Sequence, residues 1–160
     1  MKAEDLMIGD WVNLNFDVDY KTGESIYAPV QVTCINKDET IDVDFIYDKS
    51  ESMQDVLYLK LIEPIPLTEE ILHKNGFKND VLAQKSIIAE GASNFSVILF
   101  SEDNRIMLNN IDEYLNSFNT WHVHIDTEDM RTMSVAEITY VHELQHLLKL
   151  CKIEKEIILN

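Results

Sequence analysis

The hydrophobic pattern of this chain changes at two prolines, Pro64 and Pro66, and that change constrains the fold more than any other feature. Before the prolines, short segments alternate apolar and polar residues, a pattern typical of half-buried antiparallel strands. In one of them Ile41, Val43 and Phe45 share a face while aspartates occupy the other. Several short strands within about 60 residues predict a small SH3-like β-barrel. The predicted strands cover residues 6–16, where the alternation follows a turn at Gly9-Asp10, and residues 27–35, 40–46 and 56–62.

Beyond Pro66 the pattern mixes helices with strands. Thr68 can cap a short helix over 69–74, and Gly76 can end it. Ser134 and Glu137 have the spacing of a capping box, which predicts a long C-terminal helix over 135–151. Segments rich in β-branched and aromatic residues predict further strands. The remaining predictions are strands over 86–89, 94–100, 105–108, 120–126 and 156–159, a turn over 101–104 and a helix over 110–115.

Together these patterns predict an α+β protein built from two domains. Residues 1–64 are expected to form the SH3-like β-barrel, and residues 65–160 an α+β domain that contains the long C-terminal helix. At 46% apolar residues, the chain has enough hydrophobic material to bury a core.

The chain is strongly acidic, with 29 Asp and Glu against 13 Lys and Arg and a formal net charge of −16. Nucleic-acid backbones and anionic membranes attract basic patches, so we predict no direct nucleic-acid partner and no membrane partner. The sequence has no apolar run near the roughly 18 residues of a membrane span and no signal-peptide pattern, which predicts a cytoplasmic location. Cys34 and Cys151 are expected to be reduced thiols, and Cys151 an inert one.

One motif carries a mechanism, the segment HELQH at residues 142–146. On a helix, His142 and His146 project from the same face and could share a zinc ion, while Glu143 could act as general base on a metal-bound water. The segment therefore matches the signature of zinc-dependent hydrolases.

Two observations argue against zinc chemistry at this motif. A catalytic zinc needs a third protein ligand, and the residues after His146 contain no histidine, only Glu154 and Glu156 as acids. On a helical wheel, His142 and His146 lie opposite the apolar stripe of the helix. We therefore interpret the histidine face as a solvated polar surface.

A second metal site could form if the last helix crossed the polar face of the strand at 120–126. His122, His124 and Asp126 alternate on that face, and His122 and His124 could then meet the two histidines of HELQH. The competing interpretation, which we favour, is that the helix packs on the opposite face, formed by Trp121, Val123 and Ile125.

Other chemistries receive little support from the sequence. There is no Gly-rich phosphate loop among only four glycines, which argues against nucleotide enzymes. A group of acids lacks EF-hand spacing and is interpreted as a solvated face. The same group could instead mimic phosphates towards a basic nucleic-acid-binding protein. These acids are Asp38, Glu39, Asp42, Asp44 and Asp48.

Three stretches of the chain carry a family resemblance: KAEDLMIGDWV, LIEPIPLTEEILHKNGF and SVAEITYVHELQHLLKLC. They resemble a family of small uncharacterised proteins from anaerobic gut bacteria, their phages and mobile elements. The resemblance implies an SH3-like β-domain followed by an α+β domain that ends in a helix carrying YVHELQ or a close variant. Related chains often have Asn at the position of His146, which speaks against an obligatory metal ligand there. The family supplies no activity or catalytic residue.

The sequence therefore favours a non-enzymatic protein that acts through a protein partner, and the resemblance implies an origin in a phage or mobile element. Exposed edge strands, or a groove between the two domains, would make the contact, with Trp11 and Tyr58 as candidate anchors. For Trp11, a place in the barrel core is the favoured interpretation. The alternative is a zinc-dependent hydrolase that uses His142, Glu143 and His146.

Overall fold

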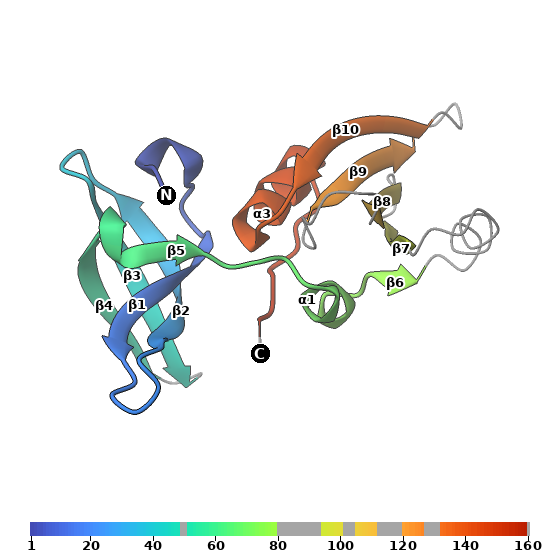
Figure 1. Ribbon diagram of the computed structural model, residues 1–160. Helices are drawn as coiled ribbons and strands as arrows, with labels where there is room; N and C mark the ends of the chain where they lie inside the picture. Colours follow the sequence, from blue (N-terminus) through green and yellow to red (C-terminus); the bar gives the residue numbers. More distant parts are fainter. Residues whose placement is uncertain (49–50, 80–93, 101–104, 112–119, 127–131, 160) are drawn as a thin grey trace. The chain divides into compact units, whose positions relative to one another are not determined.

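The computed structural model describes residues 1–48, 51–79, 94–100, 105–111, 120–126 and 132–159. These residues lie mostly in strands of two five-stranded sheets, accompanied by short helices, so the fold is α+β with strands predominating (Figure 1). The chain divides into two compact units. Unit 1 comprises Met1–Ile65 and Tyr140–His146, and unit 2 comprises Pro66–Thr139 and Leu147–Asn160. Residues 140–146, which the sequence placed in the second domain, thus belong with unit 1.

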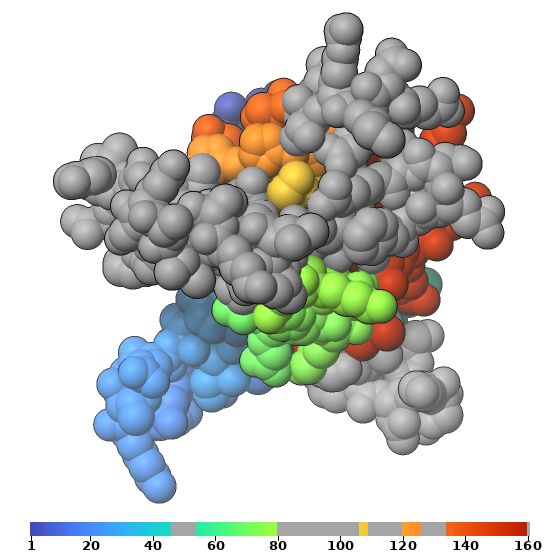
Figure 2. All heavy atoms as spheres, turned by 90° about the vertical axis from the view of Figure 1, so that its right-hand side faces the viewer, coloured from blue at the N-terminus to red at the C-terminus, as the bar shows by residue number. Residues whose placement is uncertain are grey.

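Unit 1 is an antiparallel meander whose last strand returns to its first. Successive strands pair as hairpins, and the short β5 then pairs with β1 through Val12↔Pro64 and Leu14↔Ile62, giving the order β4-β3-β2-β1-β5. The space-filling view shows the end of the β1–β2 hairpin as a light-blue projection (Figure 2). The elements are η1 (Ala3–Asp5), β1 (Trp11–Val18), β2 (Ser25–Ile35), β3 (Thr40–Asp48), β4 (Glu51–Tyr58), η2 (Leu59–Leu61) and β5 (Ile62–Pro64).

The core of unit 1 follows the alternation of its sequence. Inward-facing residues of three neighbouring strands are 5% exposed or less, because every second side chain points to the same side of a pleated sheet. Burial of such side chains contributes about 1.5–3 kcal/mol each. These core residues are Val12, Leu14, Val30, Val32, Ile41 and Val43.

The predicted strand over 40–46 is confirmed and that over 27–35 is extended, but the other two differ from prediction. The first strand begins only at Trp11, because residues 7–10 form a turn closed by hydrogen bonds between Met7 and Asp10. The segment 56–62 is split: β4 ends at Tyr58, a 3₁₀ turn follows, and β5 starts at Ile62. Pro64 is the last residue of β5, at a strand end where its missing N–H is tolerated.

Unit 2 contains a second meander, with the order β10-β9-β8-β7-β6. The predicted helix Glu69–Lys74 is confirmed as α1, with Thr68 Oγ1 accepting a hydrogen bond from Ile71 N at 3.3 Å and Gly76 at a φ of 78°. Trp121 is buried, and its indole N–H donates to Leu67 O at 3.0 Å. The strands are β6 (Lys78–Asn79), β7 (Asn94–Phe100), β8 (Arg105–Ile111), β9 (Trp121–Asp126) and β10 (Thr132–Ile138).

The long C-terminal helix predicted over 135–151 is wrong in its first part. Residues Thr132–Ile138 form β10, which pairs with β9, and the helix α3 covers only Val141–Leu150. The cap is not the Ser134–Glu137 box, because Glu143 Oε2 accepts the Tyr140 N–H at 3.0 Å. Pairing with β9 satisfies the backbone of this segment and outweighs its local helical preference.

Some shorter predictions also differ or cannot be compared. The strand over 94–100 is confirmed as β7, but no strand forms over 156–159, where Ile157 is buried and Asn75 hydrogen-bonds the backbone of Ile158. The predicted helix over 110–115 begins inside β8, and its part beyond Ile111 lies outside the described residues, as do the strand over 86–89 and the turn over 101–104. No helix in the described part of the chain is long and apolar enough to cross a membrane.

Candidate functional site

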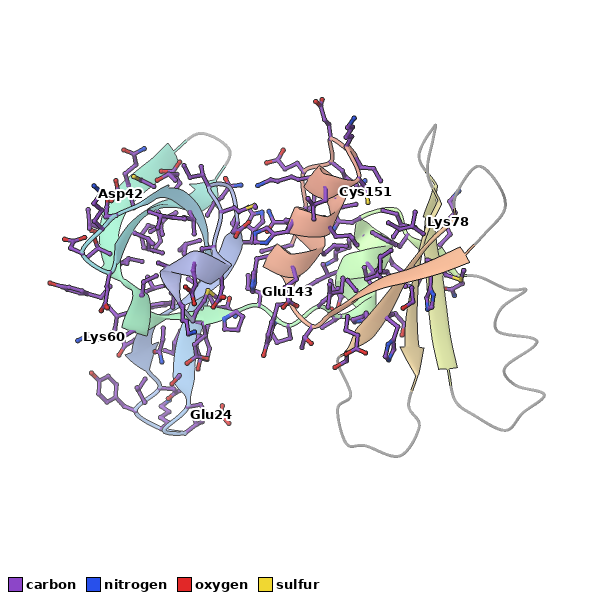
Figure 3. All side chains as sticks on the ribbon, turned by 90° about the horizontal axis from the view of Figure 1, so that it is seen from above. Glu24, Asp42, Lys60, Lys78, Glu143 and Cys151 are labelled. Carbon is purple, nitrogen blue, oxygen red and sulfur yellow. The ribbon has the colours of Figure 1, made fainter. Side chains whose placement is uncertain are left out.

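The HELQH segment forms the first turns of α3, and its local contacts fix where the helix starts. Figure 3 shows Glu143 near the beginning of α3 and Cys151 just past its other end. The Tyr140 N–H donates to Glu143 Oε2, and the Val141 N–H donates to Ile65 O at 2.9 Å. Two of the N–H groups that a helix N-terminus leaves without helical partners are therefore satisfied. Glu143 serves the helix as its capping carboxylate.

Gln145 connects the helix to the start of β1. Its Oε1 accepts the Trp11 N–H at 2.9 Å, and its Nε2 donates to Gly9 O at 2.8 Å. The Gln145 side chain is buried, and the hydrogen bonds join residues more than 130 positions apart in the sequence. A primary amide offers both a donor and an acceptor, which matches a backbone carbonyl and N–H presented together.

Asp10 and His146 form the second connection. Asp10 is fully buried, and its Oδ2 lies 2.8 Å from His146 Nε2 and accepts the Met7 N–H at 2.7 Å. Its other oxygen, Oδ1, is buried without a hydrogen-bond partner among the described residues. Burying a carboxylate costs free energy unless it is paired. His146 and the Met7 N–H supply the partners that allow Asp10 to be buried here.

His142 lies between two rings and is only 5% exposed. Its ring stacks on Tyr140 with centroids 5.8 Å apart and meets His146 edge-on at the same distance. Burial lowers the pKa of His142 below its ordinary value of 6.5, and the nearby carboxylates of Asp10 and Glu143 only partly oppose this effect. Within the part of the chain that the structure describes, His142 Nδ1 is buried and has no hydrogen-bond partner.

The interpretation of the histidine face as a solvated polar surface is wrong. His142 and Gln145 are buried, and His146 keeps only 22% of its side chain exposed. The helical-wheel argument assumed that only the apolar stripe finds a partner. In the structure, the turn at Gly9–Trp11 presents polar groups that match this face, so the face is buried rather than solvated.

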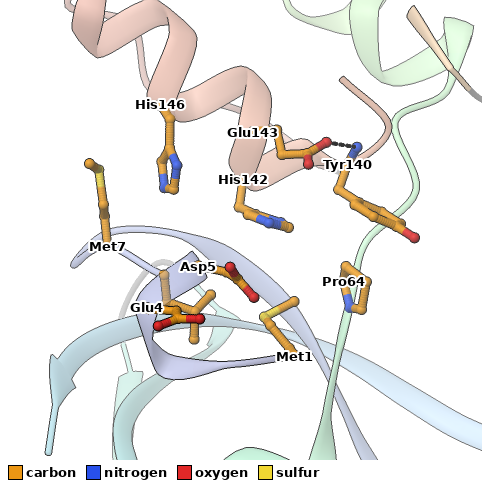
Figure 4. Close-up of a pocket in the computed structure, with 10 residues that line it drawn as sticks. Met1, Glu4, Asp5, Met7, Pro64, Tyr140, His142, Glu143 and His146 are labelled. Carbon is orange, nitrogen blue, oxygen red and sulfur yellow. Dashed lines mark hydrogen bonds between the residues drawn. The ribbon is translucent and has the colours of Figure 1, made fainter. Parts of the chain in front are cut away.

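A pocket of about 650 Å³ opens beside His142 within unit 1 (Figure 4). Its acidic residues are Glu4, Asp5 and Glu143, and none of the described residues that line it is Lys or Arg. Aromatic and sulfur-containing side chains complete the wall. The lining residues are Met1, Glu4, Asp5, Leu6, Met7, Pro64, Tyr140, His142, Glu143 and His146.

The histidines of the predicted metal sites lie in different units of the chain. His122 and His124 lie on β9 in unit 2, where His122 Nδ1 is 3.3 Å from Glu137 Oε1, whereas His142 and His146 belong to unit 1. Among the described residues, no three His, Cys, Asp or Glu side chains are grouped so that they could hold a metal ion. HELQH therefore brings two histidines together, with the carboxylate of Asp10 paired to one of them at 2.8 Å.

The two candidate anchors have different environments. Trp11 is buried at 8% exposure and so offers no contact surface, but it is not part of the core cluster of unit 1, to which its neighbour Val12 belongs. Tyr58 is 58% exposed on β4, an edge strand of its sheet, and the Lys60 ammonium lies 5.4 Å from its ring centroid.

Sequence reasoning missed Asp10, Tyr140 and Gln145. Asp10 was assigned only to a Gly-Asp turn, and Gln145 occupies a variable position of the zinc signature. A signal was nevertheless present, because Gln145 and His146 are polar residues on a helix that is otherwise rich in leucine. Comparison of the chain with models of protein families, with curated proteins and with solved structures finds no match.

Proposed function

We propose that this protein is a non-enzymatic protein-binding module and that the end of its β1–β2 hairpin contacts the partner. The observation that carries the proposal is a set of large apolar side chains exposed on this one hairpin. We call them the hairpin tip: Phe16 (56% exposed), Val18 (45%), Tyr20 (95%), Ile26 (38%) and Tyr27 (42%). Large apolar side chains concentrated on one exposed hairpin favour an interaction surface, and tyrosines are enriched at such surfaces.

The hairpin tip is ordered by its own backbone contacts. The ladder between β1 and β2 continues to Val18↔Ser25, with a register shift at Phe16. Asp19 closes the turn, since its carboxylate accepts the Lys21 N–H at 2.7 Å and its carbonyl accepts the Gly23 N–H at 2.7 Å. Gly23 has a φ of 74°, which glycine adopts without strain. A preformed loop loses little entropy on binding.

The charges around the hairpin tip indicate a basic partner. Asp17, Asp19 and Glu24 lie among the apolar residues, against Lys21 as the single base between 16 and 27. A partner surface that pairs apolar groups with Lys or Arg would complement this pattern. A second copy of the chain fits less well, because two chains of net charge −16 repel each other.

The acidic group around Asp38 is a weaker candidate for the surface that contacts this basic partner. The carboxylate of Asp38 accepts the Thr40 hydroxyl at 2.6 Å, and Asp42 accepts Asn36 Nδ2 at 2.9 Å. The hydrogen bond from Thr40 lowers the pKa of Asp38. The carboxylate of Asp38 therefore stabilises the turn in which it lies. We therefore assign the basic contact to the hairpin tip, where apolar and acidic groups occur together, rather than to a phosphate mimic at residues 38–48.

The zinc-dependent hydrolase is the less favoured function. Glu143 accepts the Tyr140 N–H, and His146 is paired with Asp10, so two of its three residues have structural partners. The proposed module further includes an SH3-like character for unit 1, supported by a meander whose short fifth strand pairs with the first. A cytoplasmic location and an origin in a phage or mobile element remain part of the same proposal.

Site-specific photocross-linking tests the hairpin tip. With a photoreactive phenylalanine analogue at Tyr20, we expect one discrete adduct with a basic protein in cells that carry this gene, weakened by high salt. The Phe16→Ser, Tyr27→Ser variant should lose it. The matched control places the same analogue at Tyr58, which is exposed on β4. Equal adducts from both positions, an adduct only with a second copy, or no adduct would contradict the proposal.

A further inference from the structure

The residues that line the pocket beside His142 are of the kind that bind a cation. It is lined by the carboxylates of Glu4, Asp5 and Glu143, with no Lys or Arg among the described residues that line it. Lys2 offsets part of this charge from outside, because its ammonium lies 3.1 Å from Glu4 in an exposed pair. A pocket of about 650 Å³ holds a long side chain or a small molecule.

The inner end of the pocket carries a second and independent observation. His142 lines the pocket and is 95% buried (5% exposed), and its Nδ1 lacks a hydrogen-bond partner among the described residues. Buried polar atoms without partners are rare, and a bound group is one explanation of such an atom. Figure 4 shows the imidazole between Asp5 and Tyr140, facing the pocket. A neutral imidazole donates from one ring nitrogen and accepts at the other, so in the tautomer that carries its proton on Nε2 the partner of Nδ1 is a donor.

The shape of the wall selects among cations. A metal ion would need several close ligands, and no group of three metal-binding side chains occurs in the described part of the chain. A guanidinium is planar, carries five N–H donors, stacks on aromatic rings and pairs with carboxylates. Here the Tyr140 and His142 rings are nearly parallel, at 9°, with Asp5 opposite.

We propose that this pocket binds a guanidinium group, that of an arginine side chain or of free arginine. One face of the guanidinium lies against the Tyr140 ring. Its N–H groups donate to His142 Nδ1 and to the carboxylates of Asp5 and Glu4. This site goes beyond the proposed function, because it uses none of the hairpin-tip residues and stands or falls independently of a contact there.

The test is a titration of the ¹⁵N-labelled full-length protein with N-acetyl-arginine amide, followed by NMR of the His142 imidazole. Saturable shifts are expected, with binding at least tenfold weaker for the citrulline analogue, which keeps the shape and removes the charge. Asp5→Asn should weaken arginine binding about tenfold, whereas the control Glu24→Gln, at the hairpin turn, should leave it unchanged. A dispersed amide spectrum verifies that each variant is folded.

Further arms separate the sources of the ligand. Tighter binding of an arginine-containing tripeptide than of free arginine identifies a protein side chain, and the reverse identifies the free amino acid; either supports the guanidinium site. No saturable shift at about 10 mM, equal binding of arginine and citrulline, or saturation by zinc chloride but not by arginine would overturn the proposal.

Discussion

Asp10→Ala is expected to lower the free energy of unfolding of unit 1 by about 3 kcal/mol. Asp10 is fully buried, and its carboxylate joins the Met7 N–H to His146 Nε2. Alanine leaves both groups without this acceptor and opens a small cavity. Denaturant unfolding followed by the fluorescence of Trp11, in a Trp121→Phe background, measures the loss in unit 1.

Two further variants define what Asp10 contributes. Asp55→Ala removes an exposed carboxylate on β4 whose hydrogen bond among the described residues is to the neighbouring Val56 N–H, and it should cost less than about 0.5 kcal/mol. Asp10→Asn keeps one acceptor oxygen for Met7 and should fall between the two. If Asp10→Ala were as stable as Asp55→Ala, the buried pair with His146 would not exist in solution.

Gln145→Met is expected to destabilise unit 1 by about 2 kcal/mol, although methionine is similar in size and a good helix former. The substitution removes the acceptor of the Trp11 N–H in a buried position. Gly9 O keeps a second donor, Gln31 Nε2 at 3.1 Å, so the loss at the carbonyl is smaller. The same fluorescence assay applies, and the Trp11 amide should also exchange its hydrogen faster than in the unmodified protein.

Leu150→Gln is the matched control for Gln145→Met, because Leu150 is on the same helix and is 79% exposed. This change should leave stability within about 0.5 kcal/mol. A Gln145→Met protein with unchanged stability and unchanged exchange at Trp11 would show that the helix does not use this side chain to hold β1.

Local signals predicted those elements whose structure depends on neighbours in sequence. The helix at Glu69–Lys74 has its cap at Thr68 and its stop at Gly76, and both act within one turn. The strand around Ile41 could be predicted because a half-buried strand must alternate apolar and polar residues. The segment 135–138 was misassigned because its strand state depends on pairing with β9, which local helix signals do not encode.

The site could be predicted only in part, for the same reason. HELQH indicated correctly that His142 and His146 share one helix face, since a spacing of four fixes that. Nothing near the motif indicated that Asp10 and Gly9 would meet this face, because they are more than 130 residues away in the chain. The sequence of this helix matches the zinc signature. The feature that sets its structure apart is a polar face that is buried on a leucine-rich helix.

The HELQH side chains hold α3 to the turn before β1, and we propose that this is their role rather than zinc binding. The most direct test is a long-range ¹H–¹⁵N NMR spectrum of the histidine imidazoles of the full-length protein, recorded with and without one equivalent of zinc. Our account predicts that His146 Nε2 shows its hydrogen bond to Asp10 and that the signals of His142 and His146 stay in place. Joint, stoichiometric shifts of both histidines on addition of zinc would contradict it.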